Sequence, residues 1–367
     1  METIRVLQVL GGLNRGGAET MIMNLYRAID KSKVQFDFII HNANENAYVD
    51  EIESLGGKVY IFPKFTLKNF FLYKKYWNDF LKEHPEYKIL HSHIRSYAII
   101  FIRIAKKYGL KTIVHSHSTS NGKGVKSYIK GLLQFPIKKE SDYLFACSKI
   151  SGEWLFGKNN VCAANYRMIK NAIDTSKYRV DSSTREKYRG MFNIGDKTVY
   201  GHIGRLCEPK NHRFLLEIFS DIRKKDSDSI LLIVGEGPYR SQIESWIQQF
   251  GLEDCVVMTG ARGDVPQLLS AMDAFLFPSL WEGLPVTVIE AQAAGLPCLI
   301  SDKITSEVAV SPAVMYLPID QGTKCWVESA LSSIGKKFDV VDDIKMVGFD
   351  VNNSATELTE FYRSIYE

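Results

Sequence analysis

The sequence predicts an α/β fold made of two doubly wound domains, and three observations predict it. The chain has 367 residues, which is more than one ordinary domain core accommodates. Short apolar runs of strand length alternate with helical stretches along the chain. The alternation starts afresh after a polar stretch at 174–197, where few apolar residues keep a regular spacing. Because short apolar strands separated by helices are typical of covered parallel sheets, we expect one such sheet in each half.

The first half begins with an apolar run at 5–10 that ends in a pair of glycines. A helical pattern follows over 17–29, where Met21, Leu25 and Ala28 fall on one face. The further strands predicted in this half lie at 36–40, 58–61, 89–91, 112–115 and 143–146.

The second half repeats the pattern from residue 198. After Gly348 the chain has the pattern of one amphipathic helix, with Leu358, Phe361 and Ile365 on one face. The strands predicted here lie at 198–203, 230–234, 256–258, 274–277 and 298–300, and the helices lie at 211–224, at 239–249 and in the stretch up to about residue 294.

The composition is that of an ordinary soluble globular protein, with 45% apolar and 24% charged residues. It excludes a disordered chain, a collagen-like fibre and a coiled coil. No run of about 18 uncharged apolar residues occurs, so no membrane-spanning helix is predicted. The N-terminal residues lack the apolar segment of a signal peptide, and no two of the six cysteines have a C-x-x-C spacing. We therefore expect a reduced, cytoplasmic protein.

The two halves carry opposite charge. Residues 1–180 hold 28 Lys and Arg against 15 Asp and Glu, whereas residues 181–367 hold 18 against 27. The halves therefore face different partners or each other, unless the charges only solvate the surface. The basic half has no motif of nucleic-acid recognition, so nucleic acid is not an expected partner.

The first motif is the glycine-rich turn at 11–19, between a strand and a helix. Glycines let the backbone approach a ligand closely, and a helix N-terminus favours an anion. The turn is not a P-loop, because no Lys-Ser/Thr pair follows Gly16 and Gly17, and it is not a clean G-x-G-x-x-G motif. A purely structural turn is the alternative.

The second motif is the stretch 201–212, where a strand ends, a loop carries Arg205 and Lys210, and a helix begins. Two cations at the carboxyl end of parallel strands suit a diphosphate. The alternative is that both are ordinary surface charges.

The third motif is the stretch from Glu282 to Glu290, with Pro285 in the first turn of a helix. Two carboxylates eight positions apart, with the anion-favouring end of a helix between them, suit a polyhydroxylated ligand that carries phosphate. The E-x7-E spacing alone is common, so the surrounding string carries the specificity.

The fourth motif is a pair of H-x-H strings, His91 and His93 after one strand and His115 and His117 after the next. Such pairs could bind a metal, but no carboxylate pattern nearby completes a ligand set. We therefore favour a core or supporting role for His91, His93 and His115, and we expect no metal.

Together the motifs resemble those of retaining glycosyltransferases of family 4, which have two Rossmann-like domains in the GT-B arrangement, facing across a cleft. The resemblance covers nearly the full length, and the shape of 115–118 and 170–174 is similar to that of enzymes that build capsular or exopolysaccharide. The strings that carry it are GGAE at 16–19, IGR and KN within 203–211, VGEGP at 234–238, FPS, EGLP and EA within 277–291, and AGLP at 294–297.

The resemblance implies an acceptor-side domain at 1–180, a nucleotide-sugar-binding domain at 181–348, and a crossover helix at 349–367 that packs back toward the N-terminal domain. It implies transfer of a sugar from a nucleotide-diphosphate donor, with UDP the expected nucleotide, to a glycan or a polyprenyl-linked glycan. Transfer would retain the anomeric configuration and serve surface polysaccharide synthesis.

The resemblance also implies roles for the site residues. Arg205 and Lys210 neutralise the diphosphate, and Glu290 accepts hydrogen bonds from the ribose hydroxyls. Glu282 contacts the transferred sugar, and His117 contacts it near the reacting carbon.

Two assignments stay open, because His115 competes with His117 for the sugar and Gly12 competes with Gly17 for the phosphates. The donor-binding backbone positions that the resemblance implies are Gly16, Gly17, Gly204, Gly235, Gly283, Leu284, Pro285 and Val286.

No metal cofactor is expected, since Arg205 and Lys210 can neutralise the diphosphate. Lysines interleave with aromatic residues at 64–77 and with apolar residues at 123–139, a pattern that suits peripheral contact with anionic lipid on the inner face of the cell membrane. Ordinary amphipathic helices that bury their aromatics are the alternative.

Two other functions fit the same frame. One is a nucleotide-sugar epimerase or hydrolase, and the other is a non-catalytic nucleotide-sugar-binding module. The complete set of Arg205, Lys210, Glu282 and Glu290 favours sugar transfer over both.

Overall fold

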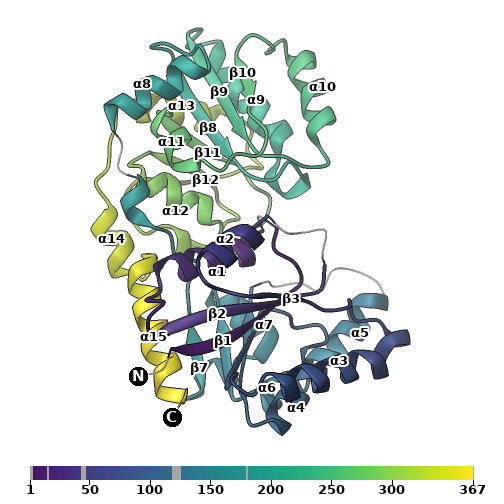
Figure 1. Cartoon of the computed structure of the whole chain (residues 1–367). Coiled ribbons are helices and arrows are strands. Elements are labelled where there is room, and N and C mark those ends of the chain that lie inside the picture. The colour runs from purple at the N-terminus through teal and green to yellow at the C-terminus, as the bar shows by residue number, and fades with distance from the viewer. Residues whose placement is uncertain (1–2, 15, 43–46, 118–124, 179–180, 367) are drawn as a thin grey trace. The chain divides into compact units, whose positions relative to one another are not determined.

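The computed structural model describes residues 3–14, 16–42, 47–117, 125–178 and 181–366, with the backbone alone at 125–129. The chain divides into two compact units, one of residues 1–172 with 351–367 and one of residues 173–350 (Figure 1). Each unit has one sheet whose neighbouring strands all run parallel. The predicted α/β class with two Rossmann-like domains is therefore confirmed.

The first unit has a seven-stranded sheet in the order β3-β2-β1-β4-β5-β6-β7. Its strands are β1 (Ile4–Leu10), β2 (Val34–Ile40), β3 (Val59–Ile61), β4 (Ile89–Ser92), β5 (Lys111–Ser116), β6 (Tyr143–Ala146) and β7 (Tyr166–Met168). Its α-helices are α1 (Gly17–Ala28), α2 (Val49–Ser54), α3 (Phe70–Glu83), α4 (Ala98–Lys107), α5 (Val125–Gln134), α6 (Ile137–Glu140), α7 (Lys149–Phe156) and α15 (Val351–Tyr366).

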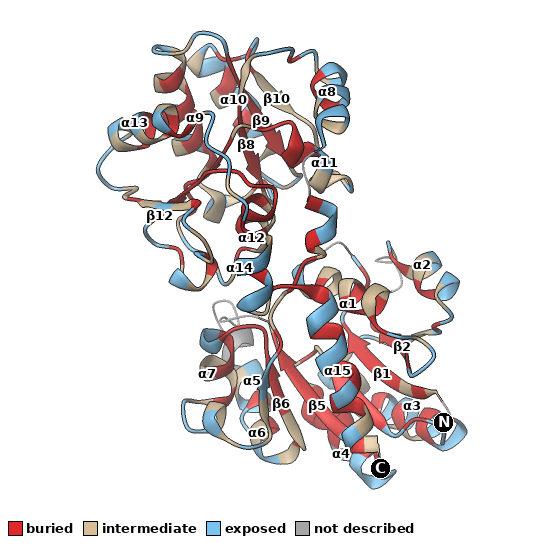
Figure 2. Cartoon of the chain, turned by 90° about the vertical axis from the view of Figure 1, so that its left-hand side faces the viewer, coloured by how far each residue is buried: buried red, intermediate tan, exposed pale blue. Residues whose placement is uncertain are grey.

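The C-terminal helix α15 packs into the core of the first unit (Figure 2). Leu358, Phe361 and Ile365 are all buried, as the amphipathic pattern predicts. The ring of Phe361 lies 5.0 Å from that of Phe145 on β6, and the Tyr362 ring meets Phe36 on β2 at a centroid distance of 6.0 Å. The last helix therefore completes the apolar core of the N-terminal domain.

The second unit has a six-stranded sheet in the order β10-β9-β8-β11-β12-β13. Its strands are β8 (Thr198–Ile203), β9 (Ser229–Val234), β10 (Val256–Met258), β11 (Ala274–Phe277), β12 (Cys298–Ser301) and β13 (Val314–Leu317). Its α-helices are α8 (Ser182–Met191), α9 (His212–Arg223), α10 (Arg240–Phe250), α11 (Val265–Ser270), α12 (Val286–Ala293), α13 (Lys324–Ser333) and α14 (Val341–Met346).

The stretch at 174–197, expected as a polar connection, contains the short 3-10 helix Thr175–Tyr178 and helix α8. Arg185 and Arg189 of α8 both form ion pairs with Asp273, at 2.5 and 2.6 Å. Ile173 forms a bridge with Asp350. The structural division falls at 172/173 and 350/351, whereas the domain bounds given above lie at 180/181 and 348/349, and the Ile173–Asp350 bridge joins the two ends of the second unit.

All six cysteines are free thiols. Within the described residues, no helix combines the length and apolar character that crossing a membrane requires.

Candidate active site

Two glycines let loops approach closely at the carboxyl ends of β8 and β9. A Cβ atom on Gly204 would lie 2.8 Å from Cε of Lys210, so the lysine stem crosses directly over this glycine. Gly235 has φ +145°, and a Cβ atom there would lie 1.9 Å from the carbonyl oxygen of Gly204. A side chain at either position would displace the loop that carries Lys210.

Lys210 meets Glu282 at this end of the sheet. Its Nζ lies 2.7 Å from Oε1 of Glu282, and the two side chains are only 13% and 16% exposed. The Nζ atom also lies 4.5 Å from the ring centroid of Phe277, which is the last residue of β11. A cation from the loop after β8 and an acid from the loop after β11 therefore form one shielded ion pair.

Backbone contacts hold these two loops together. The amide of Leu280 donates to the carbonyl of Pro209 at 2.8 Å, and the side-chain amide of Asn211 donates to the carbonyl of Pro278 at 3.1 Å. Asn211 adopts the left-handed conformation with φ 54°, which asparagine tolerates better than most residues. The pairing of Lys210 with Glu282 is thus built into the loop structure.

Arg205 lies in the same loop as Lys210, and its side chain is exposed. Burial raises the pKa of the Cys207 thiol, and the charges of Lys210 and Arg205 oppose that rise. Both predicted cations therefore lie close enough to Cys207 to affect its pKa. Among the ion pairs formed by described residues, none involves Arg205.

Glu290 lies on α12 and is partly buried. Desolvation raises the pKa of its carboxyl group, and a hydrogen bond from Tyr178 opposes that rise. The Tyr178 hydroxyl donates to Oε1 of Glu290 at 2.7 Å. Tyr178 therefore orients the acid that was assigned to the ribose, although no pattern in the sequence marked it.

Helix α12 begins at Val286 after Pro285, and no side chain caps this end. Gly283 is exposed and has open space where a Cβ atom would stand. Leu284 packs against the core of the second unit. The end of α12 therefore offers the anion-favouring partial charge that the sequence analysis expected there.

The glycine-rich turn opens helix α1 of the first unit, with Gly16 as its N-cap and Gly17 as its first residue. Gly17 is exposed and Gly12 is buried. A Cβ atom on Gly16 would lie 2.4 Å from Oε2 of Glu19, so that carboxylate folds back over the turn.

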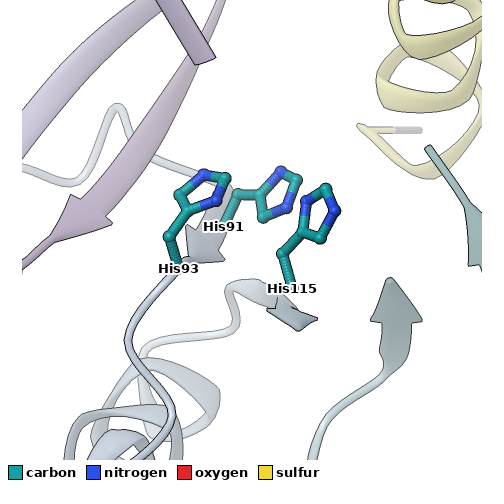
Figure 3. A group of neighbouring side chains, drawn as sticks. All are labelled: His91, His93 and His115. Atoms are coloured by element: carbon teal, nitrogen blue, oxygen red, sulfur yellow. The ribbon is translucent and has the colours of Figure 1, made fainter. Parts of the chain in front are cut away.

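Four imidazoles gather at the carboxyl ends of β4 and β5, and we call His91, His93, His115 and His117 the histidine cluster. Figure 3 shows the rings of His91, His93 and His115 side by side. Ring centroids lie 4.6 Å apart for His91 and His93, 5.3 Å for His91 and His115, and 4.1 Å for His115 and His117. Burial lowers the pKa of His91 to about 3 and holds the pKa values of His93 and His115 well below 6.5. Burial and the nearby Arg95 lower the pKa of His117 to about 3, so all four rings are neutral near pH 7.

The cluster has the ligand atoms for a metal ion, since one nitrogen each of His91, His93 and His115 lie within 4.8 Å of one another. However, Nδ1 and Nε2 of His93 both form hydrogen bonds, to His117 at 2.7 Å and to Gln8 at 3.0 Å. The rings also stack face against face, whereas metal ligands direct their lone pairs at one point. His93 is therefore held by two hydrogen bonds, whereas Nε2 of His91 and both ring nitrogens of His115 are buried and have no hydrogen-bond partner among the described residues.

The structure brings together Gly204, Lys210, Gly235 and Glu282, and it joins Glu290 to Tyr178. Gly16, Gly17 and His117 belong to the first unit, and the remaining predicted site residues belong to the second. His117 is partly exposed whereas His115 is buried.

Residues 15–177 match the model of Glycosyltransferase Family 4, and residues 184–319 match that of Glycosyl transferases group 1. The chain is 34% identical to the glycosyltransferase EpsF of Bacillus subtilis over 98% of this chain and 96% of that protein. It is 23% identical to the capsular polysaccharide biosynthesis glycosyltransferase CapH of Staphylococcus aureus, over 98% and 99% of the two chains. It is 28% identical to the UDP-Gal:alpha-D-GlcNAc-diphosphoundecaprenol alpha-1,3-galactosyltransferase of Escherichia coli, over 60% and 59%.

The fold is similar to that of Anabaena HepE in complex with UDP and glucose, with a TM-score of 0.79 at 16% identity over 98% of this chain and 100% of that one. Fold and sequence together define the class of this protein as a GT-B glycosyltransferase. The chain belongs to the glycosyltransferases that combine a family 4 domain with a group 1 domain.

Proposed function

We propose that the protein transfers a sugar from a UDP-sugar to a lipid-linked glycan, with retention of the anomeric configuration, in surface polysaccharide synthesis. The observation that carries the proposal is the shielded Lys210–Glu282 pair, a cation and an acid held at the carboxyl end of the second sheet. The names of two relatives support the donor and the pathway, since one uses UDP-galactose and the other builds capsular polysaccharide.

The chemistry follows from where charge develops. Breaking the bond between sugar and phosphate puts negative charge on the leaving phosphate and positive charge on the sugar ring. Lys210 and the exposed Arg205 stabilise the first, and Glu282 faces the sugar and stabilises the second. Glu290, oriented by Tyr178, accepts hydrogen bonds from the ribose. In this proposal the acceptor hydroxyl attacks from the face that the leaving group vacates, so that the new glycosidic bond forms as the sugar–phosphate bond breaks and the hydroxyl proton passes to the leaving phosphate oxygen.

His117 is our choice over His115 for the contact with the sugar, because its side chain is partly exposed while that of His115 is buried. Gly17 is likewise our choice over Gly12 for the phosphates, because it is exposed and leaves open space. Both assignments rest on accessibility.

The reaction needs no metal in this proposal, since Lys210 and Arg205 supply the positive charge beside the diphosphate. Treatment of the purified protein with EDTA, followed by gel filtration, should leave the rate of sugar transfer unchanged. A loss of activity that Mg²⁺ or Mn²⁺ restores would contradict this part of the proposal.

The acceptor lies at a membrane surface, and part of the first unit has the side chains for contact with anionic lipid. Phe71 is 84% exposed and Leu67 is 71% exposed, next to the exposed Lys68 and Lys75. Tyr73, in contrast, is buried. The exposed apolar residues beside exposed lysines suit a peripheral enzyme on the inner face of the cell membrane.

The second lysine-rich stretch has the same character where the structure describes it. Phe135 is 66% exposed, and Nζ of Lys138 lies 4.9 Å from its ring centroid. Lys139 is exposed as well. Lys123 and the side chain of Lys126 lie outside the described residues.

Vesicle sedimentation tests the membrane contact. The wild-type protein should sediment with vesicles of anionic lipid at moderate salt, and the double variant L67S/F71S should sediment less. The matched control is Met346→Ser, which removes an apolar side chain that is 85% exposed in the second unit. Equal sedimentation with neutral and anionic vesicles would contradict the proposal.

A donor panel tests the function itself. A UDP-sugar that binds should raise the thermal midpoint by mass action, and that donor should then yield a glycosylated product only when a polyprenyl-diphosphate-linked glycan is present. Release of free sugar or of an epimer without any acceptor would favour the hydrolase or epimerase. Binding without turnover would favour the non-catalytic module.

A further inference from the structure

A chain of hydrogen bonds in the first unit links the carboxyl ends of β4 and β5, through Gln8 on β1, to the C-terminal helix α15. Nε2 of His117 lies 2.7 Å from Nδ1 of His93, and Nε2 of His93 lies 3.0 Å from Oε1 of Gln8. Nε2 of Gln8 donates to the hydroxyl of Tyr362 at 3.3 Å. That hydroxyl lies 2.6 Å from Nδ1 of His91.

The neutral rings and the Gln8 amide oxygen decide which atom donates and which accepts in each hydrogen bond of the chain. Near pH 7 each ring is neutral, because burial lowers the pKa values of His91, His93 and His117, so each has one N–H and one lone pair. Oε1 of Gln8 can only accept, so Nε2 of His93 donates to it and Nδ1 of His93 carries the lone pair. Nε2 of His117 must then donate to Nδ1 of His93.

The direction of these hydrogen bonds also decides whether Nδ1 of His117 carries a proton. With the proton on Nε2, Nδ1 keeps a lone pair, and within the described part of the chain this buried atom has no hydrogen-bond partner. A turned Gln8 amide would reverse every bond in the chain and put the proton on Nδ1. The orientation of one buried amide therefore decides whether His117 accepts or donates a hydrogen bond.

Tyr362 is the hydrogen-bond partner of the Gln8 amide nitrogen. Its hydroxyl accepts from Nε2 of Gln8, and with the amide in this orientation the proton of the hydroxyl is available to Nδ1 of His91 at 2.6 Å. The tyrosine is buried on helix α15, and Gln8 is buried on β1. Neither side chain is exposed to solvent that could substitute for the missing partner.

We propose that Gln8 and Tyr362 are positioning residues that hold His117 in the Nε2–H tautomer, so that Nδ1 accepts a hydrogen bond from a hydroxyl group of the transferred sugar. The part that concerns the sugar rests on the proposed function. The part that concerns the tautomer stands on the hydrogen-bond geometry, with the rings neutral and the Gln8 amide oriented as described, and the two parts have separate tests.

The tautomer is read by long-range ¹H–¹⁵N NMR of the full chain labelled with ¹⁵N-histidine, with the His117 signals identified by their loss in His117→Gln. The wild type should show the Nε2–H pattern for His117. Gln8→Met keeps an apolar stem of similar length but removes the amide, and it should shift His117 to a mixture of both tautomers. Tyr362→Phe should shift it in the same direction, and Tyr366→Phe, one turn further along the same helix, should not.

An Nδ1–H pattern in the wild type would overturn the proposal, and so would an unchanged pattern in both Gln8→Met and Tyr362→Phe. The rate of sugar transfer, measured on the same samples, should fall about tenfold in Gln8→Met, the usual effect of misplacing one hydrogen bond. A shifted tautomer with a wild-type rate would refute the role of His117 in transfer and leave the positioning by Gln8 intact.

Discussion

The Lys210–Glu282 pair of the second unit and the histidine cluster of the first unit handle buried polarity in opposite ways. Lys210 and Glu282 form an ion pair at 2.7 Å. The histidines are neutral because burial lowers their pKa values, and hydrogen bonds rather than ion pairs hold His91, His93 and His117. The first region is therefore suited to a ligand with net charge, and the second to a ligand whose hydroxyl groups need directed acceptors.

The largest expected effect comes from removing the charge in the second unit. Lys210→Ala should lower the turnover of sugar transfer roughly 100- to 1,000-fold, because the leaving phosphate loses a fixed cation. Steady-state kinetics measures the loss, and thermal unfolding measured alongside shows whether the uncompensated Glu282 weakens the fold. Lys303→Ala, which removes a surface lysine paired with Asp302, is the control. A wild-type rate of sugar transfer in Lys210→Ala would show that the Lys210–Glu282 pair does not act on the charged ligand.

The next effect concerns the neutral state of the cluster. The folded protein holds the pKa of His91 at about 3, below the value of about 6.5 in an unfolded chain. The unfolded chain therefore binds the proton more readily, so the stability that neutral His91 contributes is present above pH 6.5 and is lost as the pH falls toward 3. Between pH 7 and pH 5 this histidine alone should lower the free energy of unfolding by about 2 kcal/mol.

Urea unfolding at pH 7 and pH 5 measures that share. The variant His91→Asn keeps an acceptor near the Tyr362 hydroxyl and has no titrating group, so its loss of stability between the two pH values should be smaller by about 2 kcal/mol. An identical pH dependence in the variant and the wild type would show that His91 is not held neutral by burial.

The smallest effect sharpens the role of Tyr178. Tyr178→Phe removes the hydroxyl that donates to Glu290 and should weaken UDP binding by up to about tenfold, since a hydrogen bond typically contributes about 0.5–1.5 kcal/mol. Isothermal titration with UDP measures the change. The control is Tyr316→Phe, whose hydroxyl donates to the carbonyl of Thr305. Equal affinity in Tyr178→Phe and the wild type would mean that Glu290 does not depend on this tyrosine.

The fold could be predicted where buried segments have a local apolar pattern in the sequence. Strands such as β8 and β11 are short apolar runs between turns, and the C-terminal helix shows its buried face through Leu358, Phe361 and Ile365. The edge strands β7 and β13 were missed, because both are partly exposed and carry no continuous apolar run. Helix α8 was missed because its sequence is almost entirely polar, and two of its arginines pair with the distant Asp273.

The site residues could likewise be predicted only where a local sequence pattern contains them. Arg205, Lys210, Glu282 and Glu290 stand in local strings, so their residue types and spacing were visible. Tyr178 lies 112 positions from Glu290, and Gln8 lies 354 positions from Tyr362. Residues so far apart in the sequence become partners only when the tertiary fold brings them together, and no local pattern indicates such pairs.

The central claim is that the Lys210 loop and the acids of the second unit bind an activated sugar. A crystal structure of the protein with an intact UDP-sugar tests it most directly. We predict diphosphate oxygens within hydrogen-bond distance of Nζ of Lys210 and ribose hydroxyls on the carboxylate of Glu290. A nucleotide bound elsewhere, with the Lys210–Glu282 pair and Glu290 untouched, would contradict the account.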